Sequence, residues 1–154
     1  MTSSSRVPKA VGVHRTRIEW IDTDAAGIYH NSTVIRFVEA AEARLMDERG
    51  LHGYFPAAPR VHYEVDFEAP LRFGQKTRTT VELTAIGTTS MTFRFDVWGE
   101  EFQGRPAHRA AHGRYVTAHI DRAPSGEAAG RPWPPEWIAA LQGGTRAPAE
   151  RRPY

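Results

Sequence analysis

Two aspartates, Asp22 and Asp24, stand in the sequence DTDAAG over residues 22–27, between a strand-like segment and a segment with helical periodicity. The amino end of a helix presents N–H groups without partners and a partial positive charge, so it binds electron-rich oxygen. A carboxylate beside it can attack a carbonyl carbon or take a proton. The same residues can instead serve only the turn, the aspartates through Asx-turns and Gly27 through a positive φ.

Other catalytic chemistries have less support. The chain has no cysteine, which removes thiolate catalysis and cysteine-based zinc sites. It has no G-x-S-x-G sequence to indicate a serine nucleophile. His108 and His112 have the spacing of half a zinc motif, but the alternation around them predicts a strand, on which they lie about 13 Å apart. We expect no metal site.

Composition indicates one ordinary domain of 154 residues with a net charge of +2. Basic residues are concentrated at the two ends of the chain, and this weak net charge does not indicate a nucleic-acid partner. No signal peptide and no run of about 18 apolar residues occurs, so we expect a cytoplasmic protein that does not span a membrane.

A strand over residues 11–21 leads into the turn, and a long helix starts near Asn31. Asn31, Ser32 or Thr33 can supply the N-cap oxygen. Apolar residues recur at steps of three and four along the helix, with Glu42 among the polar positions. Gly50 is predicted to end the helix in a Schellman arrangement, with the next residue folded back over the last turn.

Four further strands are predicted over residues 61–68, 76–86, 91–97 and 107–120, because apolar and polar residues alternate there. Residues 52–59 and 100–105 are expected to form loops, residues 72–75 a turn, and Gly113 a bulge in the last strand. The predicted class is α+β, one long helix against a largely antiparallel sheet of about five strands. Residues 11–121 form this domain.

The two ends of the chain differ from the domain. Residues 1–10 are polar and are predicted to be a disordered N-terminal tail. Residues 122–154 form an extension rich in Pro, Gly and Arg, in which residues 134–141 can form a short helix opened by two prolines.

A resemblance adds to these patterns. The segments RIEW at 17–20, DTDAAGI at 22–28, YHN at 29–31 and RFVEAAE at 36–42 resemble hot-dog fold acyl-CoA thioesterases of the 4-hydroxybenzoyl-CoA thioesterase class. The order and spacing of elements are similar over roughly residues 11–121. The resemblance implies the hot-dog fold, a central helix wrapped by the sheet.

The resemblance also implies roles for individual residues. Asp24 falls on the aspartate that acts as nucleophile or general base, and Asn31 falls on the backbone N–H that polarises the thioester carbonyl. Many relatives carry a histidine at or next to the position of Asn31. Here His30 precedes Asn31, so this match is offset by one residue. Asp22 is better assigned to shaping the turn. The family implies a homodimer or homotetramer with its CoA groove at the subunit interface, and no metal or organic cofactor.

The substrate implied is a thioester of CoA or of an acyl-carrier protein. The candidate substrate-binding residues are Gly27 in the turn, Trp20, Tyr29 and Phe55 for the acyl pocket, and Arg72, Arg94 and Arg114 for CoA. Two alternatives stay open. One is a hot-dog dehydratase or hydratase that uses Asp24 and His30, and the other is a non-catalytic module that binds an acyl thioester or another small ligand.

Overall fold

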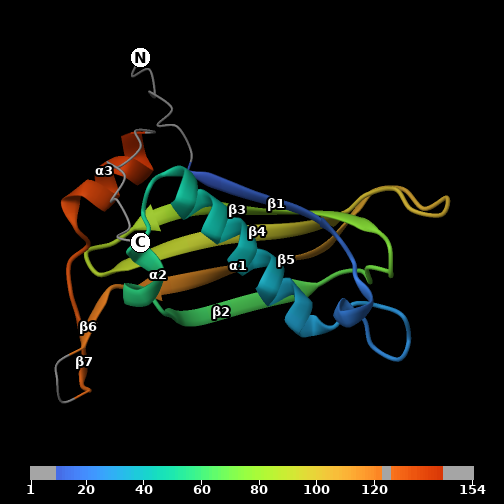
Figure 1. Cartoon of the computed structure of the whole chain (residues 1–154), viewed down its shortest axis with the longest axis horizontal. Helices are drawn as coiled ribbons and strands as arrows, with labels where there is room; N and C mark the ends of the chain where they lie inside the picture. Colours follow the sequence, from blue (N-terminus) through green and yellow to red (C-terminus); the bar gives the residue numbers. More distant parts are fainter. Residues whose placement is uncertain (1–9, 123–125, 144–154) are drawn as a thin grey trace, which may run out of the picture.

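Five antiparallel strands form one sheet in the order β1-β3-β4-β5-β2 in the computed structural model, which describes residues 10–122 and 126–143. The strands are β1 (Val11–Arg17), β2 (Arg60–Phe67), β3 (Lys76–Ile86), β4 (Ser90–Gly99) and β5 (His108–Ala118). The long helix α1 (Asn31–Glu48) lies across one face of the sheet (Figure 1). This confirms the predicted α+β class and the antiparallel sheet of five strands wrapped around one helix.

The contact between α1 and the sheet depends on a small residue in β1. A Cβ atom added at Gly12 would lie 2.1 Å from the carbonyl oxygen of Ala41 and 2.8 Å from the Cβ of Leu45. Any side chain at position 12 would therefore push the helix off the sheet. Glycine here permits close approach of two backbones.

The sheet face that meets α1 is built by alternation. Along β4 the side chains of Met91, Phe93, Phe95 and Val97 are buried, and the residues between them are more exposed. Phe93 stacks on Tyr115 of β5 with ring centroids 4.8 Å apart. The period-two pattern thus yields one apolar face and one solvated face, as expected for an antiparallel sheet with one covered side.

The prediction that the first strand extends to residue 21 is wrong, because β1 ends at Arg17 and a 3-10 turn, η1 (Trp20–Asp22), follows. The side chain of Asp22 accepts a hydrogen bond of 2.8 Å from the N–H of Glu19 and closes this turn. Trp20 and Ile21 have strong strand preferences, and one local hydrogen bond overrides them.

The carboxyl end of α1 agrees with the prediction more closely than the amino end does. Its first residue is Asn31 as predicted, but the N-cap is His30, which makes no side-chain cap bond. At the other end Gly50 has φ +72°, and the N–H of Leu51 donates to Met46 over 2.8 Å. This is the predicted Schellman closure. The prediction that Glu42 is polar-facing is wrong, since it is buried against the sheet.

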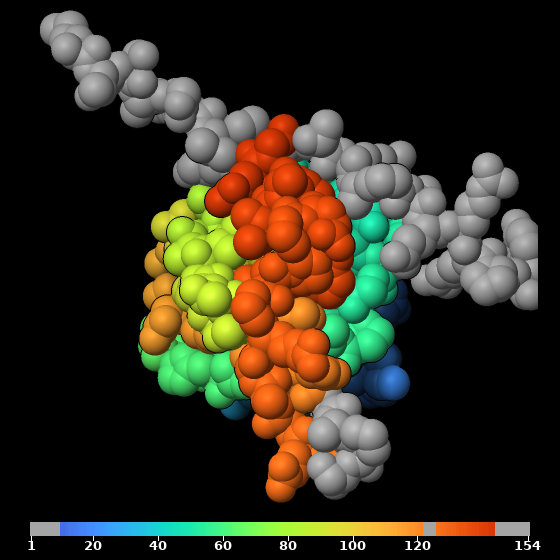
Figure 2. Space-filling model, turned by 90° about the vertical axis from the view of Figure 1, so that its left-hand side faces the viewer, coloured from blue at the N-terminus to red at the C-terminus, as the bar shows by residue number. Residues whose placement is uncertain are grey.

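Two short helices close one end of the molecule. Helix α2 (Tyr54–Ala57) lies where a loop was predicted, and α3 (Pro135–Gly143) lies close to the predicted helix at 134–141. A small hairpin of β6 (Ile120–Arg122) and β7 (Ala128–Gly130) leads to α3. Figure 2 shows α3 spread over this end. Trp133 and Leu141 are buried there, which makes this segment part of the core.

The bulge predicted at Gly113 is wrong. Gly113 pairs in register with Phe95 on one side and Val65 on the other. A Cβ atom there would lie 1.9 Å from the carbonyl oxygen of Glu64 and 2.8 Å from the Phe95 ring. The residue is needed for close approach between strands and not for an extra residue in the ladder.

Candidate active site

The segment between η1 and α1 is a tight hairpin that carries Asp24. Thr23 and Tyr29 form a β-bridge, and the N–H of Asp24 donates to Ile28 over 2.8 Å. The N–H of Gly27 donates back to the carbonyl of Asp24 over 3.0 Å, with Gly27 at φ +75°. A four-residue turn whose last residue is left-handed favours glycine, which accounts for Gly27.

The carboxylate of Asp24 is fixed at one oxygen and open at the other. Its Oδ1 accepts a hydrogen bond of 2.8 Å from the N–H of Ala26, an Asx-turn. The side chain is half-buried, and within the described part of the chain its Oδ2 has no hydrogen-bond partner. The turn therefore orients the carboxylate and leaves one oxygen available for chemistry.

Asp22 has the opposite environment and is only 3% exposed. Its carboxylate binds the N–H of Glu19 and the guanidinium of Arg36, and its carbonyl oxygen accepts the N–H of His30 over 2.7 Å and the hydroxyl of Thr33 over 3.1 Å. The bond from Glu19 closes η1, and the bonds to His30, Thr33 and Arg36 tie this turn to the start of α1. Asp22 thus shapes the junction, as the sequence indicated.

The start of α1 offers unpaired donors. Within residues 10–122 and 126–143, the N–H groups of Asn31 and Ser32 meet no acceptor, because His30 provides no side-chain cap. A surface pocket of about 360 Å³ is lined by Asp24, Ile28, Tyr29, His30, Asn31 and Ser32. The carboxylate and the helix N-terminus therefore face one space, where a negative charge that develops on an oxygen meets N–H donors and the helix dipole.

Two ring side chains at this pocket differ in availability. Tyr29 is buried, and its hydroxyl donates to the carbonyls of Ala69 and Ala110 at 3.3 and 3.4 Å. Burial raises the pKa of Tyr29 to about 12, so its proton is not free for acid–base work near neutral pH. His30 is exposed beside Asp24 and keeps its ring free of cap bonds.

The other predicted binding residues are scattered. Trp20 is 72% exposed and lies edge-on to Phe73, with ring centroids 5.6 Å apart. Arg72 lies beside the pocket, since its backbone pairs with Ile28. Phe55 lies in α2, by the opposite end of α1, about 27 Å away along an 18-residue helix. The chain does not bring Phe55 to Asp24.

Arg94 and Arg114 point away from α1. They are partners in the β4–β5 register on the solvated face of the sheet. Arg94 donates to Glu82 over 2.8 Å, and Arg114 donates to Glu64 over 3.1 and 3.2 Å. Together with these two glutamates, the arginines form a charged row across β3, β4, β5 and β2. The fold does not bring them to the Asp24 pocket.

The histidines of the half zinc motif both lie on β5. His108 contacts the carbonyl oxygens of Pro106 and Pro70, and His112 contacts Glu68 and Asp66. No group of three or more side chains suited to a metal ion occurs in the described residues. None of the helices there has both the length and the hydropathy to cross a bilayer.

A buried ionic cluster was missed by sequence reasoning. Glu42 of α1 is 1% exposed and lies 3.3 Å from Arg60, whose guanidinium sits 4.8 Å from the ring centre of Tyr115. Burial raises the pKa of Glu42, and Arg60 opposes that rise. The sequence position of Glu42 could have indicated its burial, because it follows Val38 by four residues and so lies on the same, buried face of the helix.

Comparison with known proteins gives this arrangement a class. The sequence profile of the thioesterase-like superfamily matches residues 18–141. A helix wrapped by an antiparallel sheet of this kind is the hot-dog fold of that class. The chain belongs to the thioesterase-like superfamily. No curated protein gives a significant match.

Solved structures agree on the fold. The dynemicin thioesterase, studied for polyene binding, has a TM-score of 0.75 at 19% identity, covering 85% of this chain and 94% of that one. Slr0204, a 1,4-dihydroxy-2-naphthoyl-CoA thioesterase from Synechocystis, has a TM-score of 0.72 at 20% sequence identity, and the match covers 85% of this chain and 95% of that one. A mutant 4-hydroxybenzoyl-CoA thioesterase complexed with 4-hydroxybenzoyl-CoA has a TM-score of 0.69 at 15% sequence identity, and the match covers 86% of this chain and 99% of that one.

Proposed function

We propose that the chain hydrolyses a thioester of CoA or of an acyl-carrier protein to a free acid and a thiol, with Asp24 as the catalytic carboxylate. One observation carries this proposal: Asp24 lines the same pocket as Asn31 and Ser32, whose N–H groups are unpaired within the described part of the chain. Membership of the thioesterase-like superfamily supports thioester hydrolysis as the general chemistry.

In the proposed reaction the thioester carbonyl oxygen points at the start of α1. The open oxygen of Asp24 either attacks the carbonyl carbon or takes a proton from an attacking water. The negative charge that develops on the carbonyl oxygen is stabilised by the N–H groups of Asn31 and Ser32, where the loss of one such donor costs about 3 to 4 kcal/mol of barrier. The thiolate then leaves without strong help from an acid. Where Asp24 has attacked the carbonyl carbon, water hydrolyses the resulting acyl–aspartate anhydride, which releases the free acid and restores the carboxylate.

A thiol-release screen over aromatic, short-chain and long-chain acyl-CoAs finds the preferred acyl group. With that substrate, Asp24→Asn and Asp24→Ala are expected to fold normally and to lose turnover. Asp47→Asn is the matched control, since Asp47 is exposed at the far end of α1. Near-full turnover by both Asp24 variants would remove Asp24 from the mechanism.

The dehydratase alternative is kept because His30 lines the pocket beside Asp24. A dehydratase converts a hydroxyacyl thioester to an enoyl thioester without releasing thiol. Incubation with a hydroxyacyl-CoA, with separate detection of enoyl product and of free thiol, distinguishes the two enzymes. A module that only binds gives neither product.

Association of two copies along β2 is part of the proposal. β2 is an edge strand, and its apolar face is incompletely covered, with Val61 60% and Phe67 46% exposed. Such an edge favours pairing with another strand. Light scattering is expected to report a dimer or a tetramer for the native chain and a smaller species for Val61→Glu. A native chain that is monomeric at assay concentration contradicts this part.

A further inference from the structure

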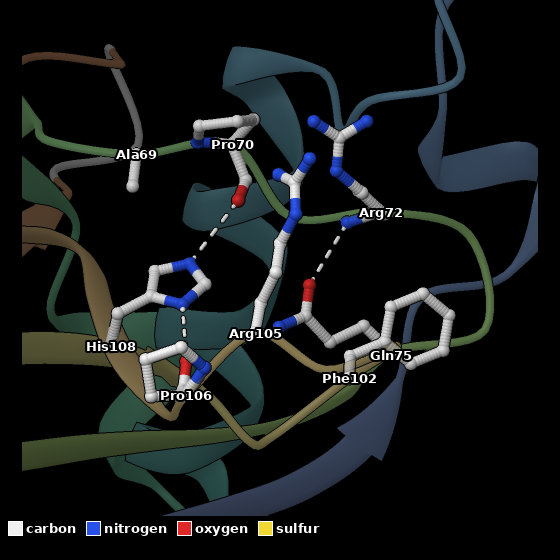
Figure 3. A pocket seen from close by; sticks show the side chains of 8 residues that line it. All are labelled: Ala69, Pro70, Arg72, Gln75, Phe102, Arg105, Pro106 and His108. Atoms are coloured by element: carbon white, nitrogen blue, oxygen red, sulfur yellow. Dashed lines mark hydrogen bonds between the residues drawn. The ribbon is translucent and has the colours of Figure 1, made fainter.

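A second pocket, of about 320 Å³, lies between the β2–β3 connection and the β4–β5 connection (Figure 3). Residues 69–75 provide one wall and residues 102–108 provide the other, so segments far apart in the sequence meet here. Its floor is apolar, made of Pro70, Phe102 and Pro106, and it carries two cations, Arg72 and Arg105.

The walls of this pocket are held by defined bonds. The side chain of Gln75 accepts the N–H of Arg72 over 3.1 Å and donates to the carbonyl of Glu100 over 2.9 Å. Phe102 and Arg105 exchange two backbone bonds of 3.0 Å around a two-residue turn in which both central residues have positive φ. This is the geometry of a type I′ hairpin, so the tip that carries Arg105 is rigid.

The two arginines have no anionic partner in the described ranges. Within those ranges no ion pair involves Arg72 or Arg105, and no carboxylate lines the pocket. By contrast, Arg94, Arg109 and Arg114 on the sheet each bind a glutamate. Two guanidinium groups over an apolar floor, without an anionic partner among the described residues, fit a ligand whose anionic group sits beside an apolar group.

This pocket shares a wall with the Asp24 pocket. The backbones of Ile28 and Arg72 pair in a β-bridge, and the N–H of Tyr29 donates to Leu71 over 2.9 Å. Ile28 lines the Asp24 pocket and Arg72 lines the second one. Paired residues in antiparallel strands lie about 5 Å apart between Cα atoms. A flexible ligand can therefore occupy both pockets at once.

We infer that the second pocket binds the phosphate end of the 4′-phosphopantetheine arm, while the thioester at its other end reaches Asp24. The phosphate of this arm is one carbon from a quaternary carbon with two methyl groups, which matches arginines beside an apolar floor. This inference rests on the proposed function. CoA and acyl-carrier proteins both carry this arm, so the pocket would bind the phosphopantetheine group that the two substrates share.

Three substrates with one acyl group test the inference: acyl-CoA, acyl-phosphopantetheine and acyl-pantetheine, of which the last lacks the phosphate. Arg105→Ala is expected to raise KM about tenfold for the two phosphate-bearing substrates, with kcat unchanged and with no change for acyl-pantetheine. Arg72→Ala is expected to do the same. Arg78→Ala, an exposed arginine on β3, serves as the control.

The other outcomes are decisive. An equal rise in KM for acyl-pantetheine overturns the inference, because that substrate has no phosphate to lose. An effect confined to acyl-CoA overturns it too, since the arginines would then bind the nucleotide. An acyl-carrier protein with the same acyl group is expected to show the same KM increase in Arg105→Ala, and an unchanged KM counts against the shared arm.

Failure of the proposed function is recognised separately. If no thioester is hydrolysed, titration calorimetry with phosphopantetheine and with pantetheine still measures the affinity of the pocket for the phosphate-bearing arm. Wild-type and Asp24→Asn proteins are expected to bind phosphopantetheine about tenfold more tightly than Arg105→Ala does. Equal affinity for all three proteins overturns the inference, whereas hydrolysis without any preference for phosphate overturns it and leaves the thioesterase proposal intact.

Discussion

The two ends of α1 treat polar groups in opposite ways. At the amino end, the N–H groups of Asn31 and Ser32 are unpaired within the described residues and Asp24 keeps one oxygen open, all facing a surface pocket. Toward the carboxyl end, Glu42 is buried against Arg60, and Gly50 and Leu51 close the last turn. Figure 1 shows loops at the first end and helices α2 and α3 at the second.

The difference lies in which polar groups a ligand can reach. At the closed end Glu42 is paired with Arg60, and the last carbonyls of α1 are capped. Within the described residues, Glu42 Oε2 and Arg60 Nε are still buried without hydrogen-bond partners, which is costly, and no ligand can reach them. The open end leaves donors to solvent, where water satisfies them until a substrate oxygen replaces it. We therefore expect substitutions at the open end to change turnover and substitutions at the closed end to change stability.

The largest expected effect is on turnover at the open end. Asp24→Ala is expected to lower kcat by about 100- to 10,000-fold, the usual worth of a positioned acid or base. The free energy of unfolding is expected to change by less than about 0.5 kcal/mol, because the lost hydrogen bond is an exposed one. Urea denaturation and steady-state kinetics measure both. A large loss of stability breaks the contrast between the two ends.

The second effect is on stability, through the contact of Gly12 with Ala41 and Leu45 in the second half of α1. Gly12→Ala is expected to destabilise the fold by about 3 kcal/mol, because its Cβ would collide with the backbone of α1. Thermal and urea unfolding test this. Gly130→Ala is the control, since a Cβ there meets nothing closer than 3.8 Å. If Gly12→Ala unfolds like the native chain, α1 is not pinned to β1 as described.

The third effect depends on pH at the closed end. Burial raises the pKa of Glu42 above its ordinary value of 4.5, so the folded chain holds this proton more tightly than the unfolded chain. The resulting stabilisation is full below pH 4.5 and is lost as pH rises through the folded pKa. Glu42→Gln lacks this loss. Its stability relative to the native chain is therefore expected to increase from pH 4 to pH 7.

Urea denaturation at several pH values measures that difference, in which the other titrating groups cancel. Burial raises the pKa of Tyr54 and of Tyr115, which face Glu42, so both tyrosines stay neutral over this range. Glu48→Gln, at an exposed position on the same helix, is the matched glutamate-to-glutamine control. A difference for Glu42→Gln that does not rise with pH contradicts the direction of the shift.

The smallest effect is expected on the solvated face of the sheet. Arg94→Ala removes an exposed ion pair with Glu82 and is expected to cost less than about 0.5 kcal/mol. KM for acyl-CoA is expected to stay unchanged, because Arg94 points away from both pockets. An increase in KM would return Arg94 to the substrate-binding residues and would show that the solvated face takes part in binding.

Local patterns predicted much of this fold. The alternation in β3, β4 and β5 and the Schellman signal at Gly50 gave the strands and the helix end in the right places. The turn before α1 was predicted as a candidate site because Asp24 and Asn31 are close in sequence. The 3-10 turn at Trp20 was missed, since strand preference there is outweighed by one hydrogen bond to Asp22.

Features that depend on tertiary contact were not predictable from one sequence. Glu42 carries a charge, and only the packing of α1 reveals that Arg60, 18 residues later, lies 3.3 Å from it. The pair of Arg72 and Arg105 is separated by 33 positions and meets only because two connections fold side by side. No periodicity in the sequence records either contact.

Helix α3 affects where this chain can be shortened. Composition places a boundary near residue 121, because residues 122–154 are rich in Pro, Gly and Arg. Yet Trp133, 3% exposed, stacks on His119 at 5.0 Å and on Tyr54 at 6.1 Å. Ending the chain at the compositional boundary would uncover an aromatic surface and invite aggregation. We therefore expect that a shortened chain must run through Gly143, the end of α3, to keep this aromatic surface covered.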